Sequence, residues 1–450
     1  MLSSIKNKSA ALKVTEKLYI VLLLVIFGGI VLHAPISVGL GVLWPHYDLL
    51  IKSWKEILML VAGVLALVIL WRHRQLRILK EPLMLAIAAY ALLHLLLVPL
   101  LWRGTQATMA GLMIDLRYIL FFGLVYIAIR LYPQLKKAFL LTFIAGGLVV
   151  LVFAILQVFV LPADVLVNIG YSKTTIVPYL TVDLNRSYIR INSTLRGPNP
   201  LGAYAVIILT FVLAAVLKRK IPPMNRSRIT AIVLLLGGVV ALWASYSRSA
   251  IIAAVVGLGI VAIVSLSGKI SRKVWIIGCV VLFALIGGLI AGRSSSFVSN
   301  VLLHDNPGRT SNIDSNAGHA SSLQDGVARV IARPFGAGIG STGSASLYTD
   351  NPLVIENQYL FTAHESGWLG LALFIGIYLM IMVKLWRRRQ SYVALAVFAS
   401  GVGLAVIGLL LPVWVDDTVS IIWWGLAAIA IGSMNMEYGL NNNKILKNNK

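Results

Sequence analysis

The chain has 450 residues, of which 59% are hydrophobic and only 12% are charged. A soluble globular protein is roughly 45–50% apolar and about 25% charged, so this composition excludes a soluble protein and indicates lipid as the main solvent. The net charge of +23 is typical of nucleic-acid-binding proteins, but the positions of the basic residues argue against nucleic acid. The single cysteine, Cys279, lies in an apolar run, which excludes an intramolecular disulfide and a cysteine metal cluster.

Long apolar segments recur from one end of the chain to the other. A helix needs about 20 mostly apolar residues to cross about 30 Å of hydrocarbon. The sequence predicts spans at residues 18–41, 55–71, 82–101, 109–129, 138–161, 201–217, 229–246, 249–267, 274–291, 366–383, 392–412 and 418–435. The first follows a basic N-terminus without a convincing cleavage site, so we interpret it as a span, with Pro35 as a candidate for a break. We therefore predict an all-α integral membrane protein with about 12 transmembrane helices in a single polytopic domain, 1–450.

The basic residues fall mostly in alternate connections between these spans. If the N-terminus is cytoplasmic, every short cytoplasmic connection is basic, as the positive-inside rule requires. These basic residues are Lys6, Lys8, Lys13, Lys17, Arg72, Arg74, Arg77, Lys80, Arg130, Lys136, Lys137, Lys218, Arg219, Lys220, Arg226, Arg228, Lys269, Arg272, Lys273, Lys384, Arg387, Arg388, Arg389, Lys444, Lys447 and Lys450. The pattern predicts that both termini are cytoplasmic, and it explains most of the net charge.

The remaining basic residues lie outside or near the outer ends of helices, and most of them are arginine. Because the positive-inside tendency depletes this face of basic residues, an arginine-rich outer face indicates a functional requirement. The planar guanidinium group matches the oxygens of phosphate and carboxylate groups. The alternative for any one arginine is a salt bridge within a loop or a contact with an anionic headgroup.

Two outer segments, 162–200 and 292–365, are too long to be simple connections, and loops of this length are commonly functional or disordered. In the second, Leu323, Val327 and Ile331 repeat every four residues until Pro334 ends the pattern. This spacing predicts a short amphipathic helix near 321–333 that lies on the outer surface. We expect 292–365 to form an extracytoplasmic loop region.

Arginine motifs occur at the outer ends of three predicted spans. The Arg-Gly-Pro-Asn-Pro motif at 196–200 opens a span, which makes a candidate anion site, although the motif also fits a stiff turn. The Ser-Tyr-Ser-Arg-Ser motif at 245–249 puts a charge at the membrane edge, where it must face protein or water unless it snorkels. Arg117 lies inside the fourth span near Asp115, and an internal ion pair between the two is the alternative to a functional role.

Ionisable residues also surround the tenth predicted span. Glu356 and His364 are eight residues apart, so a helix would place them near one face, where a carboxylate could take a proton from an acceptor hydroxyl. The alternative is that these residues are structural, as a helix cap and as a loop residue whose hydrogen bonds are made within the protein.

The Gly-x-Gly-x-x-Gly pattern at 338–343 lacks the flanking strand and helix of a dinucleotide site, so it indicates a tight glycine turn. Lone His94 indicates a buried hydrogen-bonded residue, and the Asp-Asp pair at 416–417 indicates a solvated turn, with cation binding as the alternative.

In their order and topology, these motifs resemble the O-antigen ligase and polysaccharide polymerase superfamily over most of the chain. Ligases of this family carry a His, then Asn, Ser or Gln, then nine residues, then Gly-x-x-Gly. Here Asn357 is followed by nine residues and by Gly367-Trp-Leu-Gly370, with Glu356 in the histidine position. Similar motifs are found at 196–200, at 247–249, at Arg309 and in Arg333-Pro-Phe-Gly336.

The resemblance implies a GT-C-like membrane glycosyltransferase that needs no metal and no cofactor. It implies a donor glycan on undecaprenyl pyrophosphate and an acceptor hydroxyl on a lipid-linked or growing saccharide. We expect inversion at the anomeric carbon, with Glu356 or His364 as the base. Arginines would replace a metal electrophile by stabilising the leaving pyrophosphate. The expected pyrophosphate-binding residues are Arg196, Arg248 and Arg309, followed by Arg117 and Arg190. The expected supporting residues are Asn357, Gly367, Gly370, Pro198 and Asn199.

The resemblance leaves a ligase and a polymerase open, both in the bacterial cytoplasmic membrane with an extracytoplasmic active site. The expected partners are the lipid-linked glycan donor, the acceptor and membrane lipids, and no nucleic acid. From another class, a transporter or a flippase for lipid-linked glycans is the alternative, since twelve spans with both termini inside fit one equally well. Against it, the charged residues cluster near the outer edge and not at mid-membrane.

Overall fold

The computed structural model describes residues 12–182, 185–218, 226–267 and 315–433. Within these ranges, nine helices are long and apolar enough to cross a membrane, and two shorter apolar helices follow near the C-terminal end. The chain is therefore a helical multi-pass membrane protein. Each predicted span corresponds to one of these helices except 274–291, which lies outside the described residues.

The helices of the bundle are α1 (Val14–Gly29), α2 (His33–Leu43), α4 (Trp54–Arg72), α5 (Pro82–Leu100), α6 (Thr105–Leu131), α7 (Lys136–Phe159), α8 (Pro198–Leu217), α9 (Arg226–Ala244), α10 (Arg248–Leu266), α13 (Gln358–Arg387), α14 (Tyr392–Gly408) and α15 (Asp417–Gly432). The shorter elements are η2 (Ile30–Leu32), η3 (Pro45–Tyr47), α3 (Asp48–Lys52), η4 (Leu76–Lys80), η5 (Pro133–Leu135), η6 (Val165–Ile169), α12 (Ser315–Ala332), η9 (Gly343–Tyr348) and η10 (Val413–Val415). Two strands, β1 (Tyr179–Val182) and β2 (Asn185–Ile191), pair as an antiparallel hairpin.

The first predicted span is interrupted at η2, between α1 and α2 and shortly before Pro35, which confirms the expected break near this proline. Pro35 falls in the first turn of α2, where a helix has no internal acceptor for a backbone N–H. Pro35 is therefore compatible with α2, which begins two residues earlier at His33.

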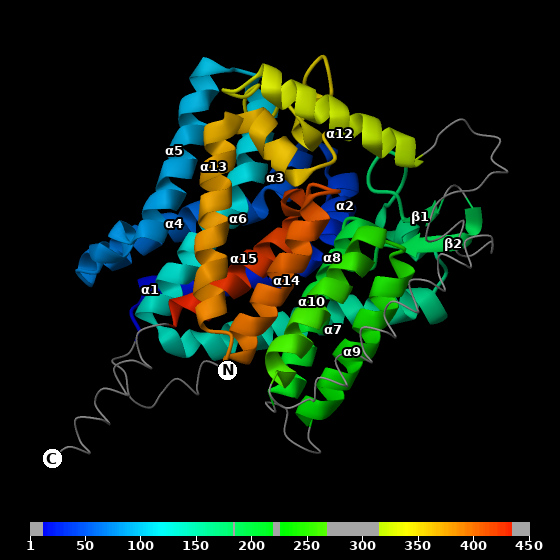
Figure 1. Cartoon of the computed structure of the whole chain (residues 1–450), viewed down its shortest axis with the longest axis horizontal. Coiled ribbons are helices and arrows are strands. Elements are labelled where there is room, and N and C mark those ends of the chain that lie inside the picture. Colours follow the sequence, from blue (N-terminus) through cyan, green and yellow to red (C-terminus); the bar gives the residue numbers. More distant parts are fainter. Residues whose placement is uncertain (1–11, 183–184, 219–225, 268–314, 434–450) are drawn as a thin grey trace.

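The core is built around α15, whose residues from Thr418 to Gly432 are all buried. A helix that is apolar on every face is stable only when other helices surround it. Figure 1 shows α15 in the middle of the bundle, with α6, α13 and α14 around it. Aromatic rings fill the space between them: the ring centroids of Trp423 and Trp424 are 5.5 Å apart, and that of Tyr378 is 5.3 Å from Trp423.

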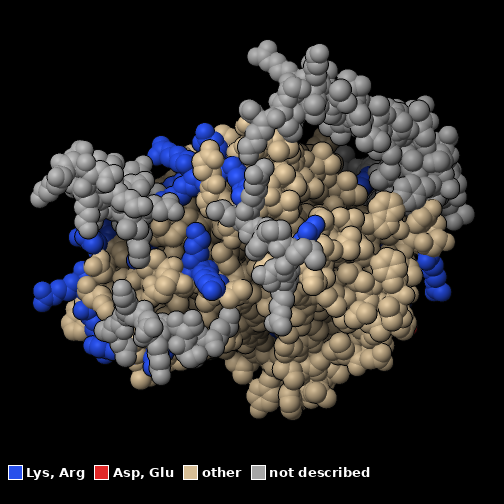
Figure 2. Space-filling view, turned by 90° about the horizontal axis from the view of Figure 1, so that it is seen from below, with Lys and Arg blue, Asp and Glu red and all other residues tan. Residues whose placement is uncertain are grey.

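One end of the bundle gathers the connections that the charge pattern predicts to be cytoplasmic. His73 contacts Glu16 at 2.7 Å, Lys218 donates to Gln390 at 3.2 Å, and residues 73–78, 130–133 and 432–433 line one pocket. Figure 2 shows this face, with Lys and Arg side chains spread over it and no Asp or Glu visible among the described residues. The alternation of connections between the two ends therefore agrees with the predicted topology.

The opposite end carries the β1–β2 hairpin and α12, which lies across the bundle (Figure 1). α12 begins at Ser315, before the predicted 321–333, and it ends at Ala332. It packs on the bundle through Gly326 and Val330, whereas the predicted apolar row of Leu323, Val327 and Ile331 is 43–66% exposed. The row that gives α12 its amphipathic pattern thus faces away from the protein.

A glycine-rich loop after α12, residues 336–343, lies between α6 and α13. The loop has positive φ angles at residues 336, 338, 340 and 343, as a tight glycine turn requires. The amides of Gly340 and Thr342 donate to the two carboxylate oxygens of Glu365, each at 3.1 Å. Gly367, with φ +70°, breaks α13 at this point, and the freed amide of Trp368 donates to Pro334 O at 2.9 Å.

We expect Gly340→Ala to destabilise the protein by about 2–4 kcal/mol, because an alanine at φ +84° is strained and its Cβ would overlap the Ala107 carbonyl. The measurement is the unfolding free energy in detergent. Gly259→Ala on α10 is the matched control, since its Cβ meets no atom within 4 Å. Equal stability of the two variants would show that the loop does not need this close approach.

Candidate functional site

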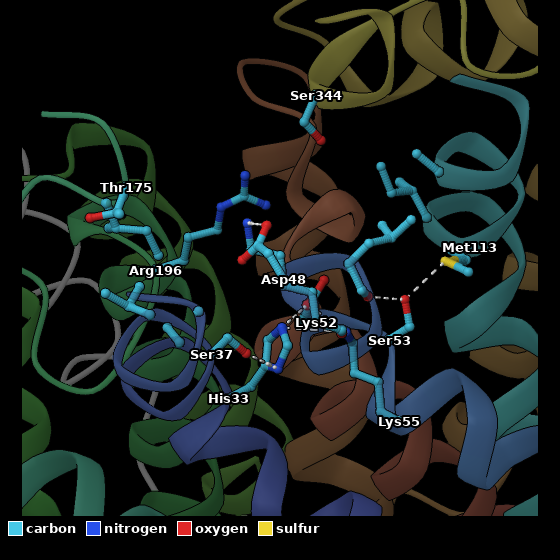
Figure 3. Close-up of a pocket in the computed structure, with 18 of the residues that line it drawn as sticks. His33, Ser37, Asp48, Lys52, Ser53, Lys55, Met113, Thr175, Arg196 and Ser344 are labelled. Atoms are coloured by element: carbon cyan, nitrogen blue, oxygen red, sulfur yellow. Dashed lines mark hydrogen bonds and ion pairs between the residues drawn. The ribbon is translucent and has the colours of Figure 1, made fainter. Parts of the chain in front are cut away.

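A cavity of about 680 Å³ opens at the end of the bundle that carries α12. Its lining comes from α2, α3, α4, α6, η9 and the first residues of α15, together with residues 174–176 and Arg196 (Figure 3). All of these belong to connections or helix ends on the predicted outer side. The volume lies in the range of small-molecule sites, roughly 300–1,000 Å³.

Asp417, the first residue of α15, holds the wall of this cavity together. Its carboxylate accepts from His33 Nε2 at 2.9 Å and from Lys55 Nζ at 3.1 Å, and it forms a close ion pair with Arg117. These groups are 3–13% exposed, so they form a buried charge cluster in place of the predicted solvated turn. The neighbouring Asp416 caps α15 by accepting from Val419 N at 2.9 Å, and burial raises the pKa of this capping carboxyl.

Arg117 does not pair with Asp115, as the alternative for this residue had predicted. Residues two apart on a helix point in different directions. Arg117 therefore faces the cavity, where it also donates to Val415 O and lies 3.9 Å from Glu56. Asp115 faces α5 and α13 instead, where its Oδ2 lies 3.5 Å from His94 Nε2 and its charge acts on Glu365.

His33 has a defined tautomer in this cluster. Its Nδ1 accepts from Trp54 Nε1 at 3.0 Å and lies 3.1 Å from Ser37 Oγ, so the hydrogen resides on Nε2 and points to Asp417. The sequence reasoning missed His33 and Lys55 as site residues. A histidine inside a predicted span was the available signal, because ionisable groups in spans are rare and commonly face a cavity.

Arg196 reaches into the cavity from the start of α8 (Figure 3). Its side chain is exposed and makes no hydrogen bond or ion pair with any residue that the structure describes. It interacts electrostatically with Asp416. Among the predicted pyrophosphate-binding residues that are described, Arg196 and Arg117 line this cavity.

Arg190 and Arg248 lie in a neighbouring cluster where two of the predicted motifs meet. Arg190 donates from Nε to Ser245 O at 2.9 Å and from Nη2 to Asn199 Oδ1 at 2.6 Å. Arg248 begins α10, and Pro198 begins α8 as the predicted stiff turn. A Cβ on Gly202 would lie 2.9 Å from Ser245 Oγ, so only a glycine allows α8 to approach this turn. Arg309 lies outside the described residues.

Glu356 and His364 do not share a helical face. α13 begins at Gln358, and Glu356 precedes it in an extended segment, half-buried, whereas His364 is buried on the helix with its Nδ1 unpartnered among the described residues. Neither residue lines the cavity. Asn357 caps α13 by accepting from Tyr359 N and Leu360 N, both at 2.9 Å. Gly367 forms the break in α13 described above, and a Cβ on Gly370 would overlap the side chain of Ser366.

A short path connects the start of α13 to the cavity. Gln358 Oε1 accepts from Trp414 N at 2.9 Å, and Trp414 belongs to η10, whose Val415 carbonyl accepts from Arg117. The hydrogen-bonded turn η10 therefore connects the start of α13, next to Glu356, to Arg117 in the cavity wall.

His94 is a buried hydrogen-bonded residue, as predicted: it is 0% exposed, and its Nδ1 lies 2.9 Å from Tyr90 O. No group of three or more His, Cys, Asp or Glu side chains that could hold a metal occurs among the described residues. No protein-family model matches the chain, and no curated protein matches it. The resemblance to the ligase and polymerase superfamily therefore rests on the sequence motifs alone.

We expect Asp417→Asn to lower the free energy of unfolding by about 3–5 kcal/mol, because the change leaves Arg117 and Lys55 buried beside a neutral amide. Asp48→Asn is the control, since its pair with Lys52 is about half exposed and such pairs contribute about 0–1 kcal/mol. The measurement is denaturation in detergent. Similar losses in the two variants would contradict a central role for the Asp417 cluster.

Proposed function

We propose that the chain is a membrane glycosyltransferase that moves a glycan from a lipid pyrophosphate to an acceptor hydroxyl at the outer face of the bacterial cytoplasmic membrane. One observation carries the proposal: a cavity of about 680 Å³ lies at the predicted outer end, and the guanidinium of Arg196, which has no ion-pair partner among the described residues, reaches into it. The motif resemblance supports the same reaction class. Both termini lie in the cytoplasm in this proposal, and a polymerase of the same superfamily remains the closest alternative.

The charges around the cavity favour Arg196 as the ligand-binding cation. Lys55 and Arg117 are held by Asp417 and Glu56, and Lys52 donates to Asp48 at 2.6 Å. Arg196 has no such partner among the described residues. An anionic ligand can therefore pair with its positive charge without breaking an internal ion pair. Arg117 contributes a fixed positive charge in the wall, held in place before any ligand arrives.

The proposed reaction is a direct displacement with inversion. An acceptor oxygen forms a bond to the anomeric carbon, the bond from that carbon to the pyrophosphate oxygen breaks, and the lipid pyrophosphate leaves with the electron pair. The hydroxyl proton passes to a base, for which Glu356 is the first candidate and His364 the second. Because neither residue lines the cavity, the acceptor approaches from the α13 side while the pyrophosphate occupies the cavity.

Transfer by the purified protein in proteoliposomes, with EDTA present, tests the proposal. We expect Arg196→Gln to reduce transfer at least about tenfold, because removing a single donor from an oxyanion site typically costs more than that. Glu356→Gln tests the base. Arg186→Gln on β2 is the control, because it removes the same charge from an exposed outer residue away from the cavity.

The same preparation distinguishes the alternatives. Product length separates one-step ligation from polymerisation. Movement of the lipid-linked glycan across the bilayer without any transfer would contradict the enzyme and identify a flippase.

The proposed orientation predicts which cysteines are labelled in intact cells. In a Cys279→Ser background, Lys173→Cys should react with an impermeant maleimide, because residue 173 is an exposed residue at the cavity end. Arg77→Cys, exposed at the opposite end, should react only after permeabilisation. The reverse pattern would place the cavity in the cytoplasm.

A further inference from the structure

Three arginines from separate parts of the chain converge beside the break in α13, away from the cavity. Arg103 lies in the connection between α5 and α6, Arg329 lies on α12, and Arg333 directly follows α12. All three are exposed, and all three act electrostatically on the same residue, His364. None of them lines the cavity.

Backbone hydrogen bonds hold this arrangement in place. Ala337 N donates to His364 O at 2.6 Å, and Ala337 O accepts from Arg103 Nε at 2.5 Å. Gly336 N donates to Arg333 O at 2.9 Å, so the loop forms a tight turn directly after Arg333 and leads to Ala337 beside His364. The positions of Arg103 and Arg333 therefore follow from the fold and not from a chance approach of two flexible side chains.

No described residue neutralises the charge of this arginine cluster. Arg329 and Arg333 make no hydrogen bond or ion pair with any described residue. The acidic residue nearest in sequence, Asp325, lies one turn before Arg329 and forms no ion pair with it. Glu365 is 1% exposed, and its two oxygens are taken by the amides of Gly340 and Thr342. Uncompensated arginines on one site favour an anionic ligand.

An exposed apolar surface adjoins the arginine cluster. α5 and α13 lie side by side at the edge of the bundle (Figure 1), and Trp368 N donates to Pro334 O at 2.9 Å, which brings the start of this surface next to Arg333. Large apolar side chains that are 50–83% exposed here are Leu96, Leu100, Trp102, Phe335, Trp368 and Leu369. In a helical membrane protein such a surface is covered by lipid chains, and tryptophans gather at the headgroup level.

We propose that the arginine cluster and this apolar surface bind an anionic phospholipid. The phosphate lies among Arg103, Arg329 and Arg333, and the acyl chains run along α5 and α13. The apolar row of α12, which faces away from the protein, extends the same contact into the interfacial region. The proposal does not rest on the proposed transfer reaction, because its arginines are not among the residues proposed to bind pyrophosphate.

Native mass spectrometry of the full chain in neutral detergent tests the proposal, with dioleoyl-phosphatidylglycerol titrated against dioleoyl-phosphatidylcholine. We expect a preferred site for phosphatidylglycerol. In Arg329→Gln/Arg333→Gln its apparent Kd should rise at least about fivefold, since each basic residue near an anionic membrane surface contributes roughly this factor. Lys173→Gln/Arg186→Gln is the matched control, because it removes the same charge from exposed residues of the same end and should leave the Kd unchanged.

Three results would overturn the proposal. One is equal affinity for the two lipids in the unchanged protein. Another is an equal loss in the two double variants, which would indicate a general effect of charge. The third is displacement of phosphatidylglycerol by millimolar inorganic phosphate, which would indicate a site for free phosphate and not for a lipid. Arg103 is left unchanged in the test, because its contact with Ala337 O also supports the loop.

Discussion

The buried ion cluster around Asp417 is the interaction on which the cavity end of the protein depends. Charged groups are costly within a membrane protein unless they are paired, so Asp417, Arg117 and Lys55 are stable only together. Asp417 begins α15, Arg117 belongs to α6, Lys55 to α4 and His33 to α2. One carboxylate thus fixes the central helix of the bundle against three others, and the cavity wall is the surface of this cluster.

The glycine loop performs the corresponding role between α6 and α13. Its amides bind Glu365, and its backbone fills the gap that the break at Gly367 opens. The loop therefore lies between two surfaces that differ in charge. The cavity has cations that are mostly paired with carboxylates, whereas the arginine cluster beside His364 has no carboxylate partner among the described residues. The proposed pyrophosphate and the proposed anionic phospholipid would therefore bind at different places.

Two of the sequence motifs meet in the structure, whereas the two candidate bases do not share a helical face. The motifs at 196–200 and 245–249 do meet, through Arg190, Asn199 and Ser245. Glu356 and His364, however, are separated by the start of α13, because Asn357 caps the helix and leaves Glu356 outside it. Helical spacing in a sequence applies only within one helix, so a cap that falls between two residues removes the expected shared face.

The sequence by itself determined that the chain is a helical membrane protein, where nearly all the described spans lie and how their connections alternate. Those properties follow from hydropathy and charge, which act over about 20 neighbouring residues. Only the tertiary structure decided that Arg117 pairs with Asp417 and not with Asp115, and that His33 and Lys55 belong to the cavity. It also decided that Arg103 joins Arg329 and Arg333. These contacts link residues that are hundreds of positions apart or on different helices, and their rotation about the helix axis depends on packing that no local pattern encodes.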